Sequence, residues 1–310
     1  MISIFFYLIP FIFFIQPVFA DNSSYHSAFS IPNLYYSNDS EGLNIYKTGA
    51  GYYSSYSDPN HLLGFNYQFN RYVSNQWSQN TNQYGFVFNK ADTNNSSGYL
   101  TNLSVNTLNG SHLLVTDSLL NFKISPTTYG QLLLNRDRIE SELSLQNRVY
   151  YTLTGASIEH QLNNRLTAVG LLGVMGISDG NYRWIFKGKL IYDLFPTSGI
   201  NLQLRYRQFR DTNTQVPNYY FNPDFYSETL FGIGIKKRIS SWTLSGIAGV
   251  GRQSLSAIPS TTTKLFEASL TSPVYSQIFF RARAGYINAG EFQGPTYSYR
   301  YFMNELIFAY

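Results

Sequence analysis

Hydrophobic and polar residues alternate strictly over residues 200–207. Every second position is apolar: Ile200, Leu202, Leu204 and Tyr206. The positions between them are polar: Asn201, Gln203, Arg205 and Arg207. Because successive side chains of a β-strand point to opposite faces, this segment has one apolar and one polar face. The pattern recurs in runs of about 10 to 14 residues, longer than the usual strand of about 5 to 6, and is typical of strands that cross an outer membrane.

The alternation predicts an all-β fold, a transmembrane antiparallel β-barrel of the bacterial outer membrane with about 16 strands. The strands are expected at 28–37, 44–56, 60–72, 82–91, 98–107, 112–124, 128–138, 151–162, 165–178, 182–194, 199–211, 224–238, 241–255, 260–271, 275–287 and 297–310. The first segment and the stretch 139–150 show the pattern least clearly, so 14 strands is an alternative. A soluble β-sandwich also alternates, but its strands are shorter.

Residues 2–19 are almost continuously apolar and end in Val18-Phe19-Ala20, which resembles a cleavage site. We therefore expect a signal peptide over residues 1–20 and a barrel over residues 21–310, with a retained membrane anchor as the alternative. At the other end, an aromatic last residue follows apolar residues at most second positions: Phe302, Leu306, Phe308 and Tyr310. This resembles the C-terminal signature of bacterial outer-membrane proteins, and implies that the barrel assembly machinery recognises the strand ending at Tyr310.

The composition agrees with a barrel in lipid. The chain has 27 Tyr and 24 Phe but only 13% charged residues, and aromatic girdles mark the two membrane interfaces of such barrels. It has no Cys, which excludes disulfides and thiolate sites. No nucleic-acid module is found, and the net charge of +4 is too small to indicate a polyanion partner.

The connections fall into two classes if the last strand runs towards the periplasm. Tight inner turns are expected at 162–165, 195–199, 239–241 and 272–274, and longer outer loops at 73–81, 139–150, 211–223 and 288–296. Two segments depart from this rule: the tight outer turn Asp179-Gly180-Asn181 and the longer inner connection 92–97.

With the apolar face towards lipid, the polar faces of the C-terminal half point into the barrel. The expected inward basic residues are Arg183, Lys187, Lys189, Arg205, Arg207, Lys236, Arg238, Arg281 and Arg283. The expected inward acidic residues are Asp193, Glu228, Glu267 and Glu305. A charge facing lipid would cost about 2 to 4 kcal/mol near the midplane, so a basic, water-filled or sugar-filled lumen is predicted. Alternatively, these charges neutralise one another in a plugged interior.

The N-terminal half carries uncharged polar residues at the inward positions: Asn66, Gln68, Asn70, Asn102, Ser104 and Asn106. Such groups bind sugar hydroxyls without the desolvation cost of ions, although they are equally explained as hydrated lumen residues. Signs of catalysis are weak, because Ser111 and His112 are neighbours that point to opposite faces of a strand. The glycines of 246–251 lie within a strand rather than in a phosphate loop. We predict no enzyme activity, cofactor or metal, and keep a membrane-embedded hydrolase using His112 as a fourth alternative.

Two landmarks occur in order between Thr128 and Ser240: residues 177–183, Ile-Ser-Asp-Gly-Asn-Tyr-Arg, and residues 218–223, Asn-Tyr-Tyr-Phe-Asn-Pro. This arrangement resembles the barrel domain of exopolysaccharide export porins of the poly-N-acetylglucosamine and bacterial cellulose type, over roughly a third of the chain. The resemblance implies a mouth element formed by Asp179, Asn181, Tyr219, Tyr220 and Phe221. Those porins usually carry a helical repeat domain that this chain lacks, so a separate periplasmic repeat protein would be needed.

The function predicted is an outer-membrane channel for a polysaccharide or oligosaccharide. Its expected partners are outer-membrane lipid and a glycan or anionic solute. An acidic lumen would be expected for a cationic glycan, so a basic lumen indicates an anionic or neutral glycan or another anionic solute. The residues expected to line the lumen and guide the substrate are Arg183, Lys187, Lys189, Arg205, Arg207, Glu228, Lys236, Arg281, Arg283 and Glu305. A general or anion-selective diffusion porin is the runner-up, and a structural or adhesive surface barrel is third.

Overall fold

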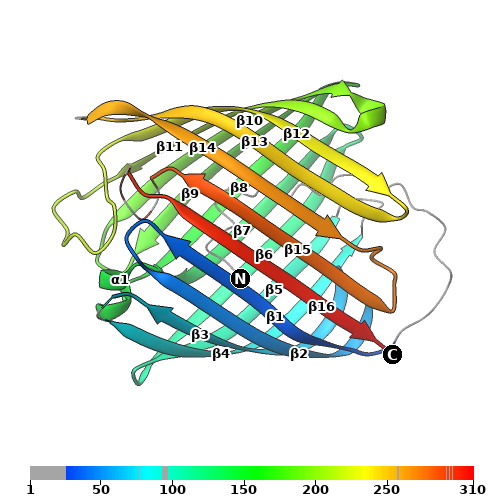
Figure 1. The fold of residues 1–310 in the computed structure, drawn as a ribbon, viewed down its shortest axis with the longest axis horizontal. Helices are drawn as coiled ribbons and strands as arrows, with labels where there is room; N and C mark the ends of the chain where they lie inside the picture. Colours follow the sequence, from blue (N-terminus) through cyan, green and yellow to red (C-terminus); the bar gives the residue numbers. More distant parts are fainter. Residues whose placement is uncertain are drawn as a thin grey trace.

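The computed structural model describes residues 26–310 except 76, 93–96, 257, 291, 293 and 295. In this part of the chain, 16 antiparallel strands form one closed barrel, in which β1 pairs with β16 (Figure 1). The predicted 16-strand barrel is confirmed, and the 14-strand alternative is wrong. The predicted signal peptide at 1–20 lies outside the described residues.

The strands are long enough to cross a membrane at a tilt. Their bounds are β1 (Ala28–Asp39), β2 (Asn44–Asp58), β3 (His61–Val73), β4 (Ser78–Asp92), β5 (Ser97–Leu108), β6 (Ser111–Ser125), β7 (Thr128–Arg138), β8 (Tyr150–Asn163), β9 (Leu166–Ile177), β10 (Tyr182–Phe195), β11 (Ile200–Asp211), β12 (Tyr226–Ile239), β13 (Trp242–Leu255), β14 (Ile258–Thr271), β15 (Ile278–Asn288) and β16 (Tyr299–Ala309). Two short helices are α1 (Glu142–Gln146) and the 3-10 helix η1 (Pro196–Ser198). Among the described residues, no helix is long and apolar enough to span a membrane.

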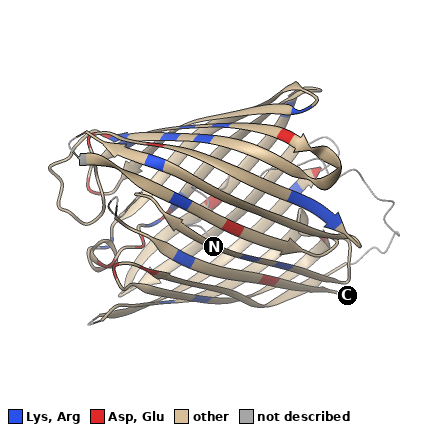
Figure 2. Ribbon diagram, turned by 45° about the horizontal axis from the view of Figure 1, so that its top comes forward, with Lys and Arg blue, Asp and Glu red and all other residues tan. Residues whose placement is uncertain are grey.

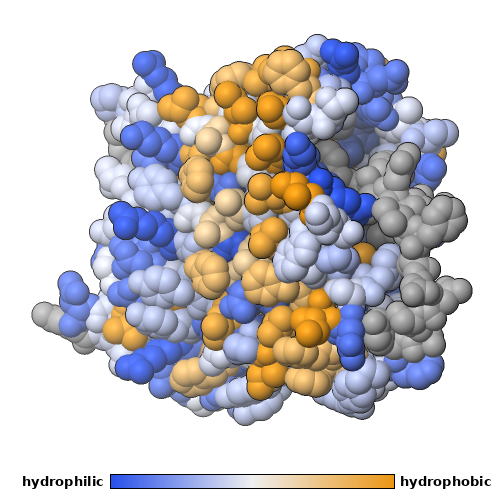
Figure 3. Space-filling model, turned by 45° about the vertical axis from the view of Figure 1, so that its right-hand side comes forward, coloured by the Kyte–Doolittle hydropathy of each residue, from blue (hydrophilic) through white to orange (hydrophobic). Residues whose placement is uncertain are grey.

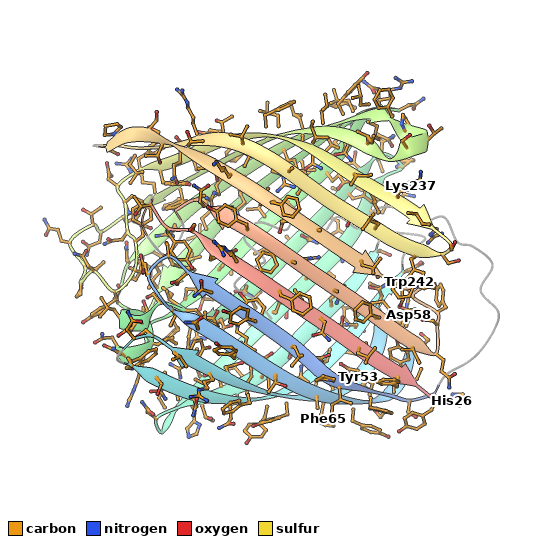
Figure 4. The ribbon with its side chains drawn as sticks, in the orientation of Figure 1. His26, Tyr53, Asp58, Phe65, Lys237 and Trp242 are labelled. Carbon is orange, nitrogen blue, oxygen red and sulfur yellow. The ribbon has the colours of Figure 1, made fainter. Side chains whose placement is uncertain are left out.

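The two faces of each strand meet different surroundings. On β11, Asn201, Gln203 and Arg207 are buried against the inside of the barrel, whereas Leu204 is 44% exposed on the outside. The same division on the other strands gives an apolar band around the outer surface (Figure 3). Figure 4 shows one of its members, Phe65, pointing away from the barrel. The alternation therefore separates a lipid-facing belt from a polar lumen, as expected from the sequence.

The two ends of the barrel differ. At one end, which we call the terminal end, backbone hydrogen bonds join Ser27 and Tyr310, and Lys237 and Trp242 lie at the same end (Figure 4). The tight turns predicted at 162–165, 195–199 and 239–241 lie at this end, whereas the connection predicted at 272–274 is longer and spans 272–277. In the turn at 239–241, Ser240 and Ser241 have φ of 47° and 73°. These are the left-handed values that a two-residue hairpin turn requires. The connection predicted at 92–97 includes residues outside the described part of the chain.

At the opposite end, the loop end, three connections are long: 139–149, 212–225 and 289–298. The first contains α1, for which Ser141 is the N-cap, so the irregular pattern of 139–150 belongs to a helical loop and not to a strand. The long loop predicted at 73–81 is wrong. Ser78 to Thr81 continue β4 in register with β3, and only residues 74–77 separate the two strands.

We predict that a charge in the middle of the outer belt destabilises the barrel. Leu172, 67% exposed at the centre of β9, and Leu162, 52% exposed near the terminal end of β8, are a matched pair. Leu172→Arg should lower the free energy of unfolding in lipid vesicles by about 2 to 4 kcal/mol, and Leu162→Arg by about 0 to 1 kcal/mol. Equal effects in denaturant titrations would contradict the position of the belt.

Candidate functional site: the lumen and its mouth

The predicted lumen residues all lie on inward faces. Three of them are buried: Arg183, Arg207 and Glu228, with exposures of 2%, 7% and 5%. The others are half-buried on the wall of the barrel: Lys187, Lys189, Arg205, Lys236, Arg281, Arg283 and Glu305. The structure therefore divides the set into residues enclosed at the loop end and residues that line the lumen.

Arg183 binds one wall residue and one loop. Its Nε donates to Asp211 Oδ1 over 2.7 Å and its Nη2 donates to Asp211 Oδ2 over 2.8 Å. The two residues form a bidentate ion pair between β10 and β11. Nη2 also donates to the backbone oxygen of Phe221, in the connection between β11 and β12. The planar guanidinium can bind a carboxylate and a carbonyl together, so Arg183 fixes this connection to the inside wall.

Arg207 makes the equivalent arrangement between the next pair of strands, β11 and β12. Its Nε donates to Glu228 Oε2 over 3.0 Å, and its Nη2 donates to the backbone oxygen of Gly290, also over 3.0 Å. Gly290 lies in the connection between β15 and β16, and its N–H donates to Gln253 Oε1 over 2.9 Å. A second loop is thus held to the wall by an ion-paired arginine.

Glu140 is the third anchor, and it joins the loop after β7 to strands β2 and β3. Lys47 Nζ lies 2.7 Å from Glu140 Oε1, and the two side chains are only 5% and 7% exposed. Tyr72 OH donates to the same oxygen over 3.0 Å. The loop that contains α1 therefore reaches across the mouth to a wall several strands away.

The three loops also bind one another, and we call residues 139–149, 212–225 and 289–298 the mouth loops. The hydroxyls of Ser141 and Ser144 donate to the backbone oxygen of Tyr219 over 2.8 and 2.7 Å. The backbone N–H of Phe221 donates to the backbone oxygen of Phe292. Because each loop is tied both to the wall and to another loop, the mouth loops form one connected layer. Figure 1 shows these connections at the end of the barrel where α1 lies.

The two landmarks of the predicted mouth element meet in this layer. Tyr220 OH donates to Asp179 Oδ2 over 2.8 Å and accepts from Asn181 Nδ2 over 3.1 Å. Gly180 has φ of +90°, which closes the tight turn expected there. Tyr220 is 4% exposed, and burial raises the pKa of its hydroxyl, so it stays protonated and donates to Asp179 at neutral pH.

Apolar packing covers the inside of the loop end. One cluster unites wall residues of β8–β12 with loop residues, of which the buried ones are Ile139, Val149, Val216 and Tyr220. A second unites residues of β1–β3 and β12–β16 with Leu43, Leu145 and Ala289. Burial of these side chains stabilises the loops in their inward position by the hydrophobic effect.

The opposite wall is built from amides and hydroxyls, as the inward positions of the N-terminal half predict. Asn70 Nδ2 and Asn106 Nδ2 both donate to Thr81 Oγ1, over 2.9 and 3.2 Å. Gln68 Nε2 donates to Asn70 Oδ1 over 2.6 Å. The lumen thus has a network of uncharged polar groups on β3–β5, whereas the half-buried basic residues lie on β10–β12 and β15.

Several of these residues were missed by sequence analysis. The alternation of β2 places Lys47 on an inward face and that of β11 does the same for Asp211, so both could have been included. Glu140 lies in an irregular loop, and no local pattern points to it.

The structure gives no support for catalysis by the sequence candidates. Ser111 faces inward and receives a hydrogen bond from Arg138 Nη2 over 3.4 Å, whereas His112 is exposed on the outer face. No group of three His, Cys, Asp or Glu residues that could hold a metal occurs in the described part of the chain.

No protein-family model and no curated protein sequence matches the chain. Its fold is similar to that of a bacterial polysaccharide outer membrane secretin, with a TM-score of 0.67 and 13% identity over 92% of this chain and 99% of that one. An anion-selective porin from Comamonas acidovorans gives a TM-score of 0.42 with 8% identity, covering 92% of this chain and 98% of that one. Pseudomonas aeruginosa OccK5 (OpdH) gives 0.43 with 10% identity and the same coverages. The first similarity shows a shared barrel fold.

Proposed function

We propose that the chain is a bacterial outer-membrane channel, without enzymatic activity, for the passage of a polysaccharide or oligosaccharide. The observation that carries this proposal is the closed barrel with an apolar outer belt and two polar inner walls, one rich in amides and one basic. Amides bind sugar hydroxyls, and charged groups bind charged substituents, so the lumen offers weak contacts along a path rather than one tight pocket. The fold shared with a polysaccharide outer membrane secretin supports the same choice.

In this proposal the terminal end faces the periplasm and the mouth loops face the outside. Outer-membrane barrels have short periplasmic turns and longer extracellular loops, which matches the two ends described above. The C-terminal strand ending at Tyr310 is the part we expect the barrel assembly machinery to recognise. A periplasmic repeat protein, if the exporter uses one, would dock at the terminal end.

The basic residues would have two roles. Arg183 and Arg207 hold the mouth loops inward, so we propose that they keep the channel closed at rest. The half-buried set, Lys187, Lys189, Arg205, Lys236, Arg281 and Arg283, with Glu305 beside Arg281, would guide the substrate along the lumen. The mouth element of Tyr219, Tyr220 and Phe221 would then be part of a gate rather than of a fixed entrance.

An anion-selective diffusion porin is the second candidate, favoured by the surplus of basic over acidic residues on the inward faces of β8–β16. The two functions differ in the effect of added glycan. A polysaccharide channel should be blocked by oligosaccharide applied from the terminal end, whereas a porin for small ions should conduct unchanged.

Charge reversal in the lumen should change ion selectivity. Arg205→Glu converts a half-buried inward cation of β11 to an anion, and the reversal potential in a salt gradient should shift towards cation preference. The matched control is Lys237→Glu on the outer face of β12, which should leave selectivity unaltered. If Arg205→Glu conducts with the selectivity of the wild type, the assignment of this wall to the pore is wrong.

Breaking the anchor at Glu140 should open the mouth. Glu140→Gln leaves Lys47 buried without its carboxylate, a loss of about 3 to 5 kcal/mol for buried pairs in general. We expect the open fraction in single-channel recordings to rise at least about tenfold, the equivalent of about 1.4 kcal/mol. The control is Glu142→Gln on α1. An equal open fraction for the two variants would contradict the proposal that the mouth loops act as a gate.

A further inference from the structure

A groove on the outer surface of the barrel extends from the middle of the apolar belt to the loop end. It crosses strands β8 to β11 and has a volume of about 610 Å³. Leu172, Trp184 and Phe186 line it, and the first two are 67% and 60% exposed on the outside of the barrel. Gly155 and Gly173, which pair across β8 and β9, also line it. We call this site the outer groove; its volume lies within the range of about 300 to 1,000 Å³ that is usual for ligand sites.

An arginine stands at the loop-end edge of the outer groove. Arg210 lines the groove on β11, lies opposite Trp184 in the register of β10 and β11, and has a side chain that is 68% exposed. The described outward positions in the loop-end halves of β8–β12 include no other charged residue. A charge at the edge of an apolar belt is therefore placed at one point, beside the groove.

A second arginine lies on the β8 side of the outer groove. Arg136 Nη1, on β7, donates to Thr152 Oγ1 over 2.8 Å. Thr152 is one outward position nearer the loop end of β8 than Thr154, which lines the groove. The two guanidinium groups thus flank the groove at its loop-end edge.

One carboxylate lies beside these arginines. Arg210 Nη2 is 3.2 Å from Asp224 Oδ1, and both side chains are exposed to solvent. Exposed ion pairs of this kind are weak, so another anion can compete for the guanidinium. Among Arg136, Arg210 and Asp224, one positive charge is in excess. Figure 2 shows basic and acidic residues among the strand ends and loops at the loop end of the barrel.

A second groove on the outer surface has no charged residue in its lining. It crosses β2 to β6, has a volume of about 720 Å³, and is lined by aromatic residues that include Phe65, Tyr84 and Phe86. Both grooves offer an apolar surface within the belt, but the outer groove also has a cation at its edge. The difference indicates a ligand for the outer groove that is apolar along most of its length and anionic at one end.

We propose that the outer groove binds an anionic, phosphate-bearing membrane lipid. One acyl chain lies along Leu172 and Trp184, and the phosphate binds Arg210 at the loop-end edge. A guanidinium binds phosphate in a bidentate manner, and basic residues near a membrane surface attract anionic lipids. Tyr182 and Trp184, 54% and 60% exposed, are of the residue types that concentrate at the level of lipid headgroups. This site requires only that the barrel lies in a membrane, and it is independent of the solute in the lumen.

The test is fluorescence quenching by brominated lipids, because Trp184 is one of only three tryptophans in the chain. Trp77→Phe with Trp242→Phe leaves Trp184 as the reporter. The protein is placed in phosphatidylcholine vesicles that contain either brominated phosphatidylglycerol or brominated phosphatidylcholine. The anionic lipid should bind at Trp184 about fivefold more strongly than the zwitterionic one, the effect of about one charge near a membrane surface. Added salt should weaken this preference.

Two variants of the exposed ion pair separate lipid binding from a structural role. Arg210→Gln should lower the preference about fivefold, to near equality, whereas Asp224→Asn should raise it about fivefold, because it removes the competing carboxylate. Both substitutions break the same ion pair. A change in the same direction in both variants, or an unchanged preference in Arg210→Gln, would overturn the proposal.

The second groove supplies the matched control. Tyr84→Trp, in a chain whose three natural tryptophans are replaced by Phe, puts the reporter in the groove without charge, and the two lipids should quench it equally. An equal preference at both reporter positions would mean a general attraction of anionic lipid and would overturn the specific site. If neither lipid quenches Trp184, a protein surface such as a second copy of the chain covers the groove, which also overturns the proposal.

Inorganic phosphate distinguishes a lipid headgroup from a free anion. When phosphate replaces chloride at constant ionic strength, the preference at Trp184 should stay the same, because phosphate has no acyl chain to fill the groove. Loss of the preference would mean that Arg210 binds free phosphate in place of a lipid, and would refute the assignment.

Discussion

Hydrocarbon offers no hydrogen-bond partner to a backbone, and the architecture of the chain follows from this constraint. Every strand in the barrel pairs on both sides, and the β1–β16 pairing leaves no open edge. The same surroundings disfavour charge in the outer belt, and outward charged residues such as Lys237 and Arg210 lie near the ends of their strands. The polar lumen is thus a consequence of the lipid outside as much as of any substrate.

The lumen uses arginine and lysine differently. Arg183 and Arg207 each bind a carboxylate of the wall and a carbonyl of a mouth loop, which needs the planar fork of a guanidinium. The lysines of β10 have no such geometry and act as compact charges on flexible stems. The enclosed arginines and the half-buried cations Lys187, Lys189 and Arg205 therefore lie next to each other on the same strands, so movement of the loops and contacts in the lumen involve adjacent residues.

Much of the fold was predictable because a period of two fixes both the strand and the direction of each side chain. The alternation around Arg205 placed it on the inner face before any contact was known. The alternation is weaker where both faces are polar, and for that reason the pattern predicts a loop at Ser78 to Thr81, although these residues pair with β3. The mouth layer was not predictable in the same way. Glu140 and Lys47 are far apart in sequence, and only the closed barrel brings them together.

The closure of the barrel also determines how it can fold. In the described part of the chain, each strand pairs with the next one in sequence, as successive hairpins, except for the pairing of β1 with β16. Hairpins close short loops at little entropic cost, whereas β1 and β16 meet only after nearly the whole chain has been ordered. From the cost of closing so long a loop, we expect the β1–β16 pairing to form after the hairpins. We expect residues at that seam, such as Ser27 and Tyr310, to affect the rate of closure more than the assembly of hairpins.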